Sequence, residues 1–305
     1  MSNLSVLTAA QTAELLPYVA LCEEVAQAAL DCRAGLIHSP ERQVLPLPGD
    51  AVLLSMPATA ADIAIHKLVN VCPGNQHHGL PTIVGMVSVY DAATGVPRVL
   101  LDGPTVTARR TAAVSLLALR RLLAEAPRHV AVIGCGTQAA AHLGALADTY
   151  PGLRVDVHGR SAAQVQDFIA AHRQLELSLQ PGGAQVAEAA TAVLALTTSK
   201  VPVYELPARK ERLLIGVGAF KPDMAEYGAV PIHGSRIYID DPLGARHEAG
   251  DLIQAGIDWQ AVHSLADALQ DSIDFDQPRL FKSVGTAAWD LAAARCALRM
   301  QNAAR

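Results

Sequence analysis

The segment that decides the fold is His129-Val-Ala-Val-Ile-Gly-Cys-Gly-Thr-Gln-Ala-Ala-Ala-His142. An apolar run, Val130 to Ile133, turns through Gly134 and Gly136 and leads into an alanine-rich stretch typical of a helix. A G-x-G-x-x-A pattern between strand and helix is the fingerprint of a dinucleotide-binding site. Gly134 permits the tight turn, Gly136 lets the backbone approach a pyrophosphate, and Ala139 lets helix and strand pack closely. The alternative is a glycine turn in an α/β domain that binds no nucleotide.

The N-terminus of the helix after this turn would offer unpaired N–H groups and a partial positive charge to phosphates. Strands are expected at 129–133, 153–158, 184–187, 193–198, 213–217 and 236–240, with helices at 137–149 and 161–174 and a helical region at 243–271. This alternation predicts a Rossmann-type doubly wound parallel sheet. We predict a dinucleotide-binding domain over residues 111–282, with candidate cofactor contacts in the turn at Gly134, Gly136, Thr137, Gln138 and Ala139.

The rest of the chain predicts a second α+β domain with a mostly antiparallel sheet. A helix is expected at 8–35, capped by Thr8, and is followed by apolar runs at 44–47, 51–56, 63–71, 82–90 and 96–101. The last two runs flank Asp91-Ala-Ala-Thr-Gly95, which is typical of a hairpin. A helix from Thr107 to about Ala126 would connect the domains. A last helix at 283–305 would return to the first domain, which we assign to 1–110 with 283–305.

Composition limits the classes of function. The chain has 305 residues, is 51% hydrophobic and 17% charged, and carries a formal net charge of -5. This charge gives no general attraction to nucleic acid or to an anionic membrane, and no apolar run is long enough for a membrane span. No signal peptide is evident, and five cysteines without paired spacing suit a reducing compartment. We therefore expect a cytoplasmic protein with neither nucleic-acid nor membrane partners, and no metal site.

The end of the second nucleotide-domain strand bears on cofactor choice. An NAD-preferring site carries an acid about 20 residues past the glycines, on the ribose 2′-hydroxyl. Here that place falls at His158, followed by Gly159, Arg160 and Ser161. Arg160 and Ser161 suit a 2′-phosphate, which an arginine can grip with its planar fork. We predict NADPH, with NADH possible; the alternative is that Arg160 is a solvated residue at the start of a helix.

Two basic residues stand out before the fingerprint. Lys67 lies in an apolar strand, Ile63 to Val71, and strand alternation sets it on the same face as Ile65 and Val69. It would point into the protein or a pocket, unless it is a surface lysine on an edge strand. Arg110 would lie in the first turn of a helix, where a cation opposes the helix dipole. A bound carboxylate or a structural salt bridge would explain it.

Three ordered motifs carry a resemblance that covers nearly the whole chain. They are Thr107-Ala-Arg-Arg-Thr-Ala-Ala113, Gly134-Cys-Gly-Thr-Gln-Ala139 and Phe281-Lys-Ser-Val-Gly-Thr-Ala287. Together they resemble the ornithine cyclodeaminase/mu-crystallin family. The resemblance implies an NAD(P)-dependent protein with a bipartite fold that dimerises through its N-terminal domain. Family members include ornithine cyclodeaminases, alanine dehydrogenases, ketimine reductases and a hormone-binding crystallin.

The resemblance also assigns candidate site residues. Arg42, Lys67 and Arg110 match the cations that hold a substrate α-carboxylate, whereas Arg109 matches no such position. Lys67 is also the candidate proton donor, either directly or through a water. The remaining candidate cofactor contacts are Arg160, Ser161, Thr197, Ser283 and Gly285.

Departures from the cyclodeaminase pattern favour one branch. Leu54 and Phe220 stand where cyclodeaminases carry acidic residues, and Gly218-Ala-Phe-Lys-Pro-Asp-Met224 resembles the loop of Δ1-pyrroline-2-carboxylate reductases. We expect NAD(P)H-dependent reduction of Δ1-pyrroline-2-carboxylate, and of Δ1-piperideine-2-carboxylate, to L-proline and L-pipecolate. The alternatives are alanine dehydrogenase-type reductive amination, ornithine cyclodeamination, and a crystallin-like protein that binds cofactor without catalysis. A homodimer is expected because the segment Ile83 to Val89 is apolar on both faces.

Overall fold

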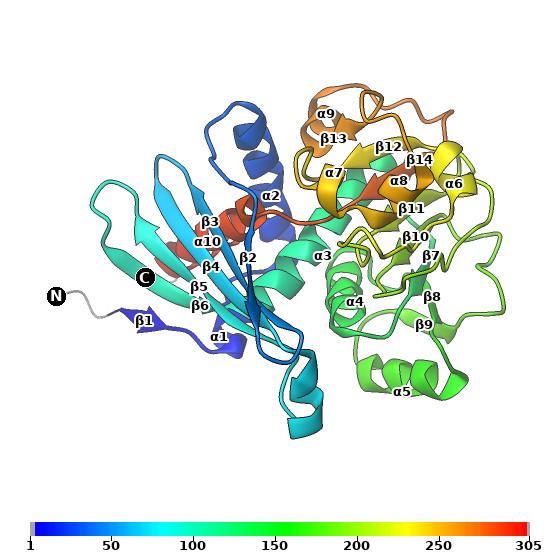
Figure 1. Cartoon of the computed structure of the whole chain (residues 1–305). Coiled ribbons are helices and arrows are strands. Elements are labelled where there is room, and N and C mark those ends of the chain that lie inside the picture. The colour runs from blue at the N-terminus through cyan, green and yellow to red at the C-terminus, as the bar shows by residue number, and fades with distance from the viewer. Residues whose placement is uncertain (1–3, 304–305) are drawn as a thin grey trace. The chain divides into compact units, whose positions relative to one another are not determined.

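The computed structural model describes residues 4–303, which divide into two compact units (Figure 1). The first unit contains the described residues up to Thr111 and those from Thr286 onward, and the second contains Ala112–Gly285. The first division falls within helix α3 (Gly103–Leu122), which begins four residues before the expected Thr107. No helix of the described residues is long and apolar enough to cross a membrane.

A mostly antiparallel six-stranded sheet forms the first unit, as the sequence predicts. Only β1 and β6 pair in parallel among its neighbours, and the other pairs are antiparallel. In sheet order the strands are β1 (Ser5–Val6), β6 (Pro97–Asp102), β5 (Ile83–Asp91), β4 (Ile63–Val71), β3 (Ala51–Thr59) and β2 (Gln43–Leu47). A short 3-10 helix, η1 (Pro73–His78), joins β4 to β5. The sheet gives the unit one face on which its helices can pack.

The turn between β5 and β6 confirms the predicted hairpin. Asp91 Oδ1 accepts hydrogen bonds from the backbone N–H of Thr94 at 3.0 Å and from its hydroxyl at 2.8 Å. Gly95 ends the turn with a φ of 70°, in the left-handed region that glycine adopts without strain. Aspartate, threonine and glycine therefore fix this turn through local chemistry that the sequence alone displays.

The helices of the first unit depart from the predicted pattern at their ends. The single helix expected over 8–35 is wrong: α1 (Ala9–Glu14) and α2 (Tyr18–Arg33) are separate because Pro17 lacks an N–H and begins a new helix. Thr8 does cap α1, in a reciprocal capping box with Gln11. The terminal helix α10 starts later than the expected 283 and spans Ala287–Ala303; it packs on β3, β4 and α2 (Figure 1).

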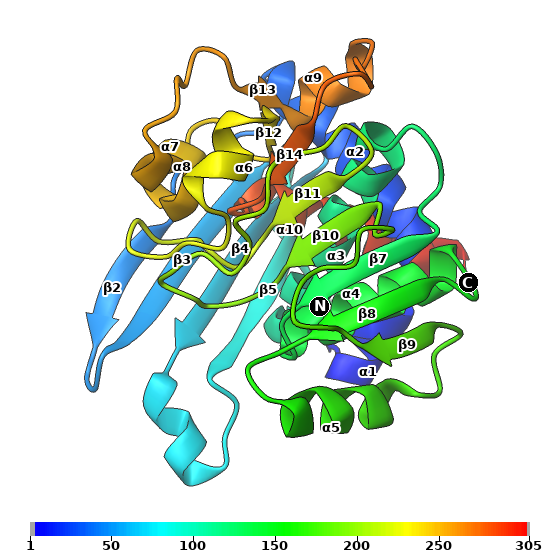
Figure 2. The same ribbon diagram turned by 90° about the vertical axis from the view of Figure 1, so that its right-hand side faces the viewer.

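The second unit is built on an eight-stranded sheet in which every neighbouring pair is parallel, confirming the Rossmann-type prediction. Figure 2 shows the strands in the order β13, β12, β14, β11, β10, β7, β8 and β9. Their bounds are β7 (His129–Ile133), β8 (Arg154–His158), β9 (Ser178–Pro181), β10 (Ala192–Ala195), β11 (Leu213–Gly216), β12 (Arg236–Ile239), β13 (His263–Ser264) and β14 (Arg279–Lys282). The strand expected at 184–187 is wrong, because the edge position beside β8 is taken by β9.

Short helices connect these strands. They are α4 (Thr137–Thr149), α5 (Ala162–His172), α6 (Ala229–His233), α7 (Ala245–Glu248), α8 (Gly250–Ala255) and α9 (Leu265–Gln270). The continuous helical region expected over 243–271 is wrong, since Gly256 adopts a left-handed φ of 65° that ends α8 and a strand follows before α9.

The strand order of the second unit indicates where a ligand would bind. β7 lies between β8, the next strand along the chain, and β10, from which the sheet continues in the opposite direction. In open α/β sheets, ligands bind at such a switch point, beyond the carboxyl ends of the strands. The carboxyl ends of β7, β8 and β10 are therefore the expected place for a cofactor.

Candidate functional site

A cavity of about 1040 Å³ lies at this switch point. Its lining comes from the segments that follow β7, β8 and β10, together with residues 183–186 and 203–206. Gly134, Gly136, Arg160 and Thr197 are the predicted cofactor contacts found in the lining. The cavity is large enough to enclose part of a dinucleotide. All of its lining residues belong to the second unit.

The turn after β7 has the geometry that the fingerprint requires. Gly134 has a φ of 128°, and a Cβ built there would lie 2.6 Å from the carbonyl oxygen of Leu196, so only glycine fits. A Cβ on Gly136 would meet no described atom within 4 Å, which leaves its backbone open to a ligand. Gly136 is also the N-cap of α4 and makes no side-chain capping bond. The first N–H groups of α4 therefore suit a phosphate.

The other predicted residues of this turn occupy different environments. Ala139 is fully buried, as expected for the residue that lets helix and strand pack closely. Gln138 Oε1 is buried and has no hydrogen-bond partner among the described residues. Thr137 begins α4 and, like Gln138 and Ala139, lies outside the cavity lining. The turn therefore brings Gly134 and Gly136 to the cavity, whereas Thr137, Gln138 and Ala139 are not part of its wall.

The segment after β8 combines a histidine with a cation. His158 lines the cavity, and burial is the main cause that lowers its pKa, against the opposing charge of Asp156. Arg160 is exposed and lines the same cavity. Ser161 is the N-cap of α5, where its hydroxyl accepts from the N–H of Gln164 at 3.2 Å. Arg160 is therefore the residue of this segment that can present a positive charge to a cofactor.

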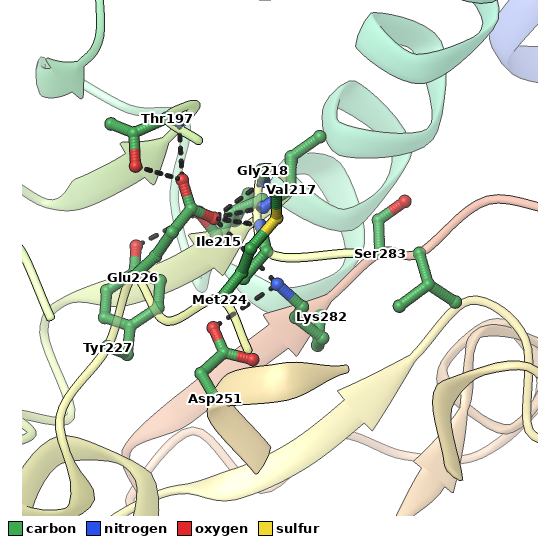
Figure 3. Close-up of polar contacts among 12 residues, drawn as sticks. Thr197, Ile215, Val217, Gly218, Met224, Glu226, Tyr227, Asp251, Lys282 and Ser283 are labelled. Carbon is green, nitrogen blue, oxygen red and sulfur yellow. Dashed lines mark hydrogen bonds and ion pairs between the residues drawn. The ribbon is translucent and has the colours of Figure 1, made fainter. Parts of the chain in front are cut away.

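Thr197, Ser283 and Gly285 are each tied to a buried carboxylate. Thr197 donates to Glu226 Oε1 from its backbone N–H at 2.6 Å and from its hydroxyl at 3.1 Å (Figure 3). Ser283 Oγ donates to Asp240 Oδ2 at 2.7 Å, and the N–H of Gly285 donates to the same oxygen at 3.0 Å. These contacts hold the chain segments that follow β10 and β14.

The first unit contains a buried cluster of opposite charges. Lys67 Nζ lies 3.1 Å from both carboxylate oxygens of Asp290, a fully buried residue of α10. Arg110 Nε lies 3.4 Å from Asp290 Oδ1. Two cations thus share one carboxylate, which leaves a net positive charge. A buried charge is costly unless another charge compensates it, so a bound anion would complete this cluster.

Strand pairing explains how Lys67 comes to be inside. Along β4, Ile63, Ile65, Lys67 and Val69 are buried, while the residues between them are partly exposed. The alternative of a surface lysine is therefore wrong. Burial is the largest cause that lowers the pKa of Lys67 from 10.5 to about 8; Asp290 raises it, and the charges of Arg110 and Arg42 lower it further. Lys67 can therefore both hold and release a proton near neutral pH.

The structure corrects the position of Arg110. It was expected in the first turn of a helix, but α3 begins at Gly103, so Arg110 lies in the helix interior. The helix-dipole argument for a bound carboxylate no longer applies, and the salt bridge to Asp290 is present. Its neighbour Arg109 points elsewhere: its guanidinium lies 3.9 Å from the centre of the Tyr18 ring, and its Nε donates to the carbonyl of Leu16 at 2.7 Å. Arg42 is half-buried, and its charge acts on Lys67.

Comparison with known proteins gives the family. Residues 3–301 match the ornithine cyclodeaminase/mu-crystallin family. The chain belongs to this family. It is 54% identical over 298 residues to the Δ1-pyrroline-2-carboxylate/Δ1-piperideine-2-carboxylate reductase of Azospirillum brasilense, covering 97% of this chain and 96% of that protein. It is 52% identical to Δ1-pyrroline-2-carboxylate reductase 2 of Burkholderia ambifaria, with the same coverage.

Solved structures support the same fold. The Δ1-pyrroline-2-carboxylate reductase of Thermococcus litoralis, solved with NADH and L-proline, superimposes with a TM-score of 0.84 at 23% identity and covers 97% of both chains. The family assignment made from the three motifs is therefore confirmed, and so is the fold class of two different sheets.

Two buried acids of this protein were not predicted from the sequence. Asp290 sits in an alanine-rich helix and contacts Lys67 across 223 positions of sequence. Glu226 is also fully buried and binds the loops after β10 and β11. The available signal was an acid within an otherwise apolar segment, Trp289-Asp-Leu-Ala292 for Asp290. Such an acid needs a buried partner, but the sequence does not say which one.

Proposed function

We propose that this protein is a nicotinamide-dependent reductase of cyclic imine carboxylates. Its substrates would be Δ1-pyrroline-2-carboxylate and Δ1-piperideine-2-carboxylate, and its products L-proline and L-pipecolate. The observation that carries the proposal is the buried cluster of Lys67, Arg110 and Asp290, which combines a titratable proton with excess positive charge. The identity of the substrate is supported by the 54% identical reductase of Azospirillum brasilense.

The second unit supplies a fitting cofactor site. Gly134 and Gly136 open the turn to a pyrophosphate, and the uncapped N-terminus of α4 offers N–H groups to it. His158 and Arg160 line the same cavity, just after β8. When bound, the reduced nicotinamide would supply a hydride to the imine carbon.

The residues of the first unit supply the rest of the chemistry. Arg42 and Arg110 would hold the substrate carboxylate through charge-assisted hydrogen bonds. As the C=N electron pair moves to nitrogen, that nitrogen takes a proton from Lys67 or from a water that Lys67 holds. Lys67 then regains a proton from solvent. Asp290 would keep Lys67 Nζ in place through both of its carboxylate oxygens.

The proposed reaction is tested by following NADPH absorbance with a panel of substrates. The panel comprises the two cyclic imines and pyruvate with ammonia; L-ornithine is incubated with oxidised cofactor, and ammonia release is measured because cyclodeamination produces no net NADPH. We expect the cyclic imines to be turned over with the highest kcat/KM. Faster turnover of pyruvate would instead favour reductive amination, and ammonia release from ornithine would favour cyclodeamination. Cofactor binding without turnover of any compound would mean a crystallin-like binding protein.

We further propose that NADPH is preferred over NADH, because Arg160 lines the cavity just after β8, where the sequence pattern predicts contact with the ribose. Arg160→Ala should raise the KM for NADPH by about 10-fold or more, since a charged hydrogen bond to the 2′-phosphate is lost. The KM for NADH should change little. Arg173→Ala is the matched control, because Arg173 is exposed at the far end of α5. Equal changes in the KM for NADPH and for NADH would show that Arg160 does not bind the 2′-phosphate.

A two-fold dimer through the sheet of the first unit is also proposed. On β5, Val87 and Val89 are buried in the core, whereas Ile83, Val84 and Met86 are 41%, 37% and 48% exposed. Apolar side chains gathered on one strand of a sheet are typical of a surface that another subunit covers.

Light scattering tests this assembly. The native protein should have the mass of a dimer, and Met86→Glu should lower the mass to that of a monomer, because it places a charge in the apolar contact. A monomeric mass for the native protein at micromolar concentration would refute the proposal.

A further inference from the structure

A single buried carboxylate ties together the loops that follow two neighbouring strands of the second unit. Glu226 Oε1 accepts from the N–H and hydroxyl of Thr197, just beyond β10 (Figure 3). Its other oxygen, Oε2, accepts from three successive backbone N–H groups beyond β11, at 3.0 Å from Val217, 2.7 Å from Gly218 and 3.2 Å from Ala219. The Glu226 carboxylate thus accepts five hydrogen bonds, and the side chain is fully buried.

A third strand joins this arrangement through an ion pair. Lys282, the last residue of β14, places Nζ 3.9 Å from Glu226 Oε2 and 3.3 Å from Asp251 Oδ2 (Figure 3). All three side chains are almost completely inaccessible to solvent. A buried carboxylate is costly unless it is paired and hydrogen-bonded, and here both conditions are met. The carboxyl ends of β10, β11 and β14 are therefore joined at one point.

The same glutamate is bonded to the wall of the cofactor cavity. Thr197, Val203 and Tyr204 all line the cavity. Thr197 bonds to the Glu226 side chain, while the N–H groups of Val203 and Tyr204 donate to the Glu226 carbonyl at 2.8 and 3.1 Å. Packing around these bonds is tight, because a Cβ built on Gly218 would overlap the Thr197 carbonyl oxygen and lie 2.6 Å from Glu226 Oε1. A methyl group added at Gly218 must therefore displace Thr197 or the loop, and a change at Glu226 alters the bonds that hold Thr197.

We propose that Glu226 is a positioning residue for cofactor binding: its carboxylate sets the place of Thr197 in the cavity wall and fixes the loop after β11 against it. This role rests on the proposed nicotinamide cofactor. It does not depend on which imine is reduced, because Glu226 acts only within the second unit.

Glu226→Gln tests the role with almost no change in shape. The amide group puts an N–H donor where an oxygen now accepts, so the N–H of Thr197 or those of the 217–219 loop lose an acceptor. Loss of such charge-assisted bonds should weaken NADPH binding by about 10- to 100-fold in a fluorescence titration. Gly218→Ala should weaken binding in the same way while leaving every charge in place, because its methyl group pushes the loop away from Thr197.

Arg279→Met is the matched control. Arg279 is a buried cation on the same strand as Lys282, but it lies at the amino end of β14 and donates to the carbonyl of Asp274 at 3.3 Å. Its loss should lower the thermal unfolding midpoint and leave the Kd for NADPH within about two-fold of native. The control separates a loss of stability from a loss of cavity shape.

The outcomes distinguish this role from the proposed reaction, because the titration contains no imine. Weak NADPH binding by both variants, with native-like binding by Arg279→Met, supports the positioning role even if no imine is reduced. Native affinity in Glu226→Gln and Gly218→Ala would overturn it, as would equal weakening by Arg279→Met. If Glu226→Gln is unfolded, Glu226→Asp is measured instead; it keeps the charge opposite Lys282 but is too short to reach both loops, and native affinity in it would also overturn the role.

Discussion

Replacement of Lys67 by methionine is expected to lower kcat for the cyclic imine by roughly 100-fold or more. Methionine keeps the bulk of the side chain within β4 but removes both the charge and the proton. Asp290 retains Arg110 as a partner, so the buried carboxylate is not left alone. The thermal unfolding midpoint and the Kd for NADPH, measured on the same variant, should stay close to native. A near-native kcat would mean that the chemistry has been assigned to the wrong residue.

The same residue predicts a pH dependence. A proton donor must be protonated, and the pKa of Lys67 is lowered to about 8, mainly by burial. The native kcat/KM should therefore fall as pH rises above about 8 and should be insensitive to Lys67 well below that value. Titration of the imine itself is common to all variants. The decrease of kcat/KM above about pH 8 should consequently be absent from Lys67→Met. If Lys67→Met still shows this decrease, another group causes it.

Replacement of Arg110 by alanine should mainly impair binding of the substrate carboxylate. Loss of a charged hydrogen bond in a buried site costs roughly 2–4 kcal/mol, or about 30- to 1000-fold in kcat/KM. Most of the loss should come from a higher KM for the imine, with the affinity for NADPH little changed.

Arg109→Ala provides the matched control at the adjacent position. Its guanidinium stacks on Tyr18 and its Nε bonds to a backbone carbonyl, so its loss should reduce stability but not the KM for the imine. An Arg110→Ala enzyme with a native KM would show that the salt bridge to Asp290 is the whole role of Arg110.

Local patterns allowed much of the fold to be predicted from the sequence. The glycine turn after β7, the hairpin at Asp91 to Gly95 and the alternation along β4 each depend on residues a few positions apart. Strands were predicted wrongly where hydrophobic periodicity did not indicate which residues pair with the sheet. β9 (Ser178–Pro181) is an edge strand whose side chains are mostly exposed, so it carries no apolar signal, whereas Ala184-Gln-Val-Ala187 carries one without forming a strand.

The candidate site was predictable only in part, for a different physical reason. The inward position of Lys67 follows from strand alternation, but its partner Asp290 lies on a helix at the other end of the chain. The Glu226 side chain likewise binds backbone N–H groups, and no pattern of side chains in the sequence predicts such contacts. Charge pairing in a protein interior is decided by tertiary packing, so a single sequence can show that a buried acid needs a partner without showing which residue it meets.

The central claim, that this protein reduces the imine carbon of a cyclic imino acid, is tested most directly by isotope transfer. Δ1-Pyrroline-2-carboxylate is incubated with NADPH deuterated at both C4 positions of the nicotinamide, and the product is analysed by mass spectrometry. The proposed reaction predicts L-proline that carries one deuterium at Cα. Consumption of the labelled cofactor without deuterated proline would contradict it.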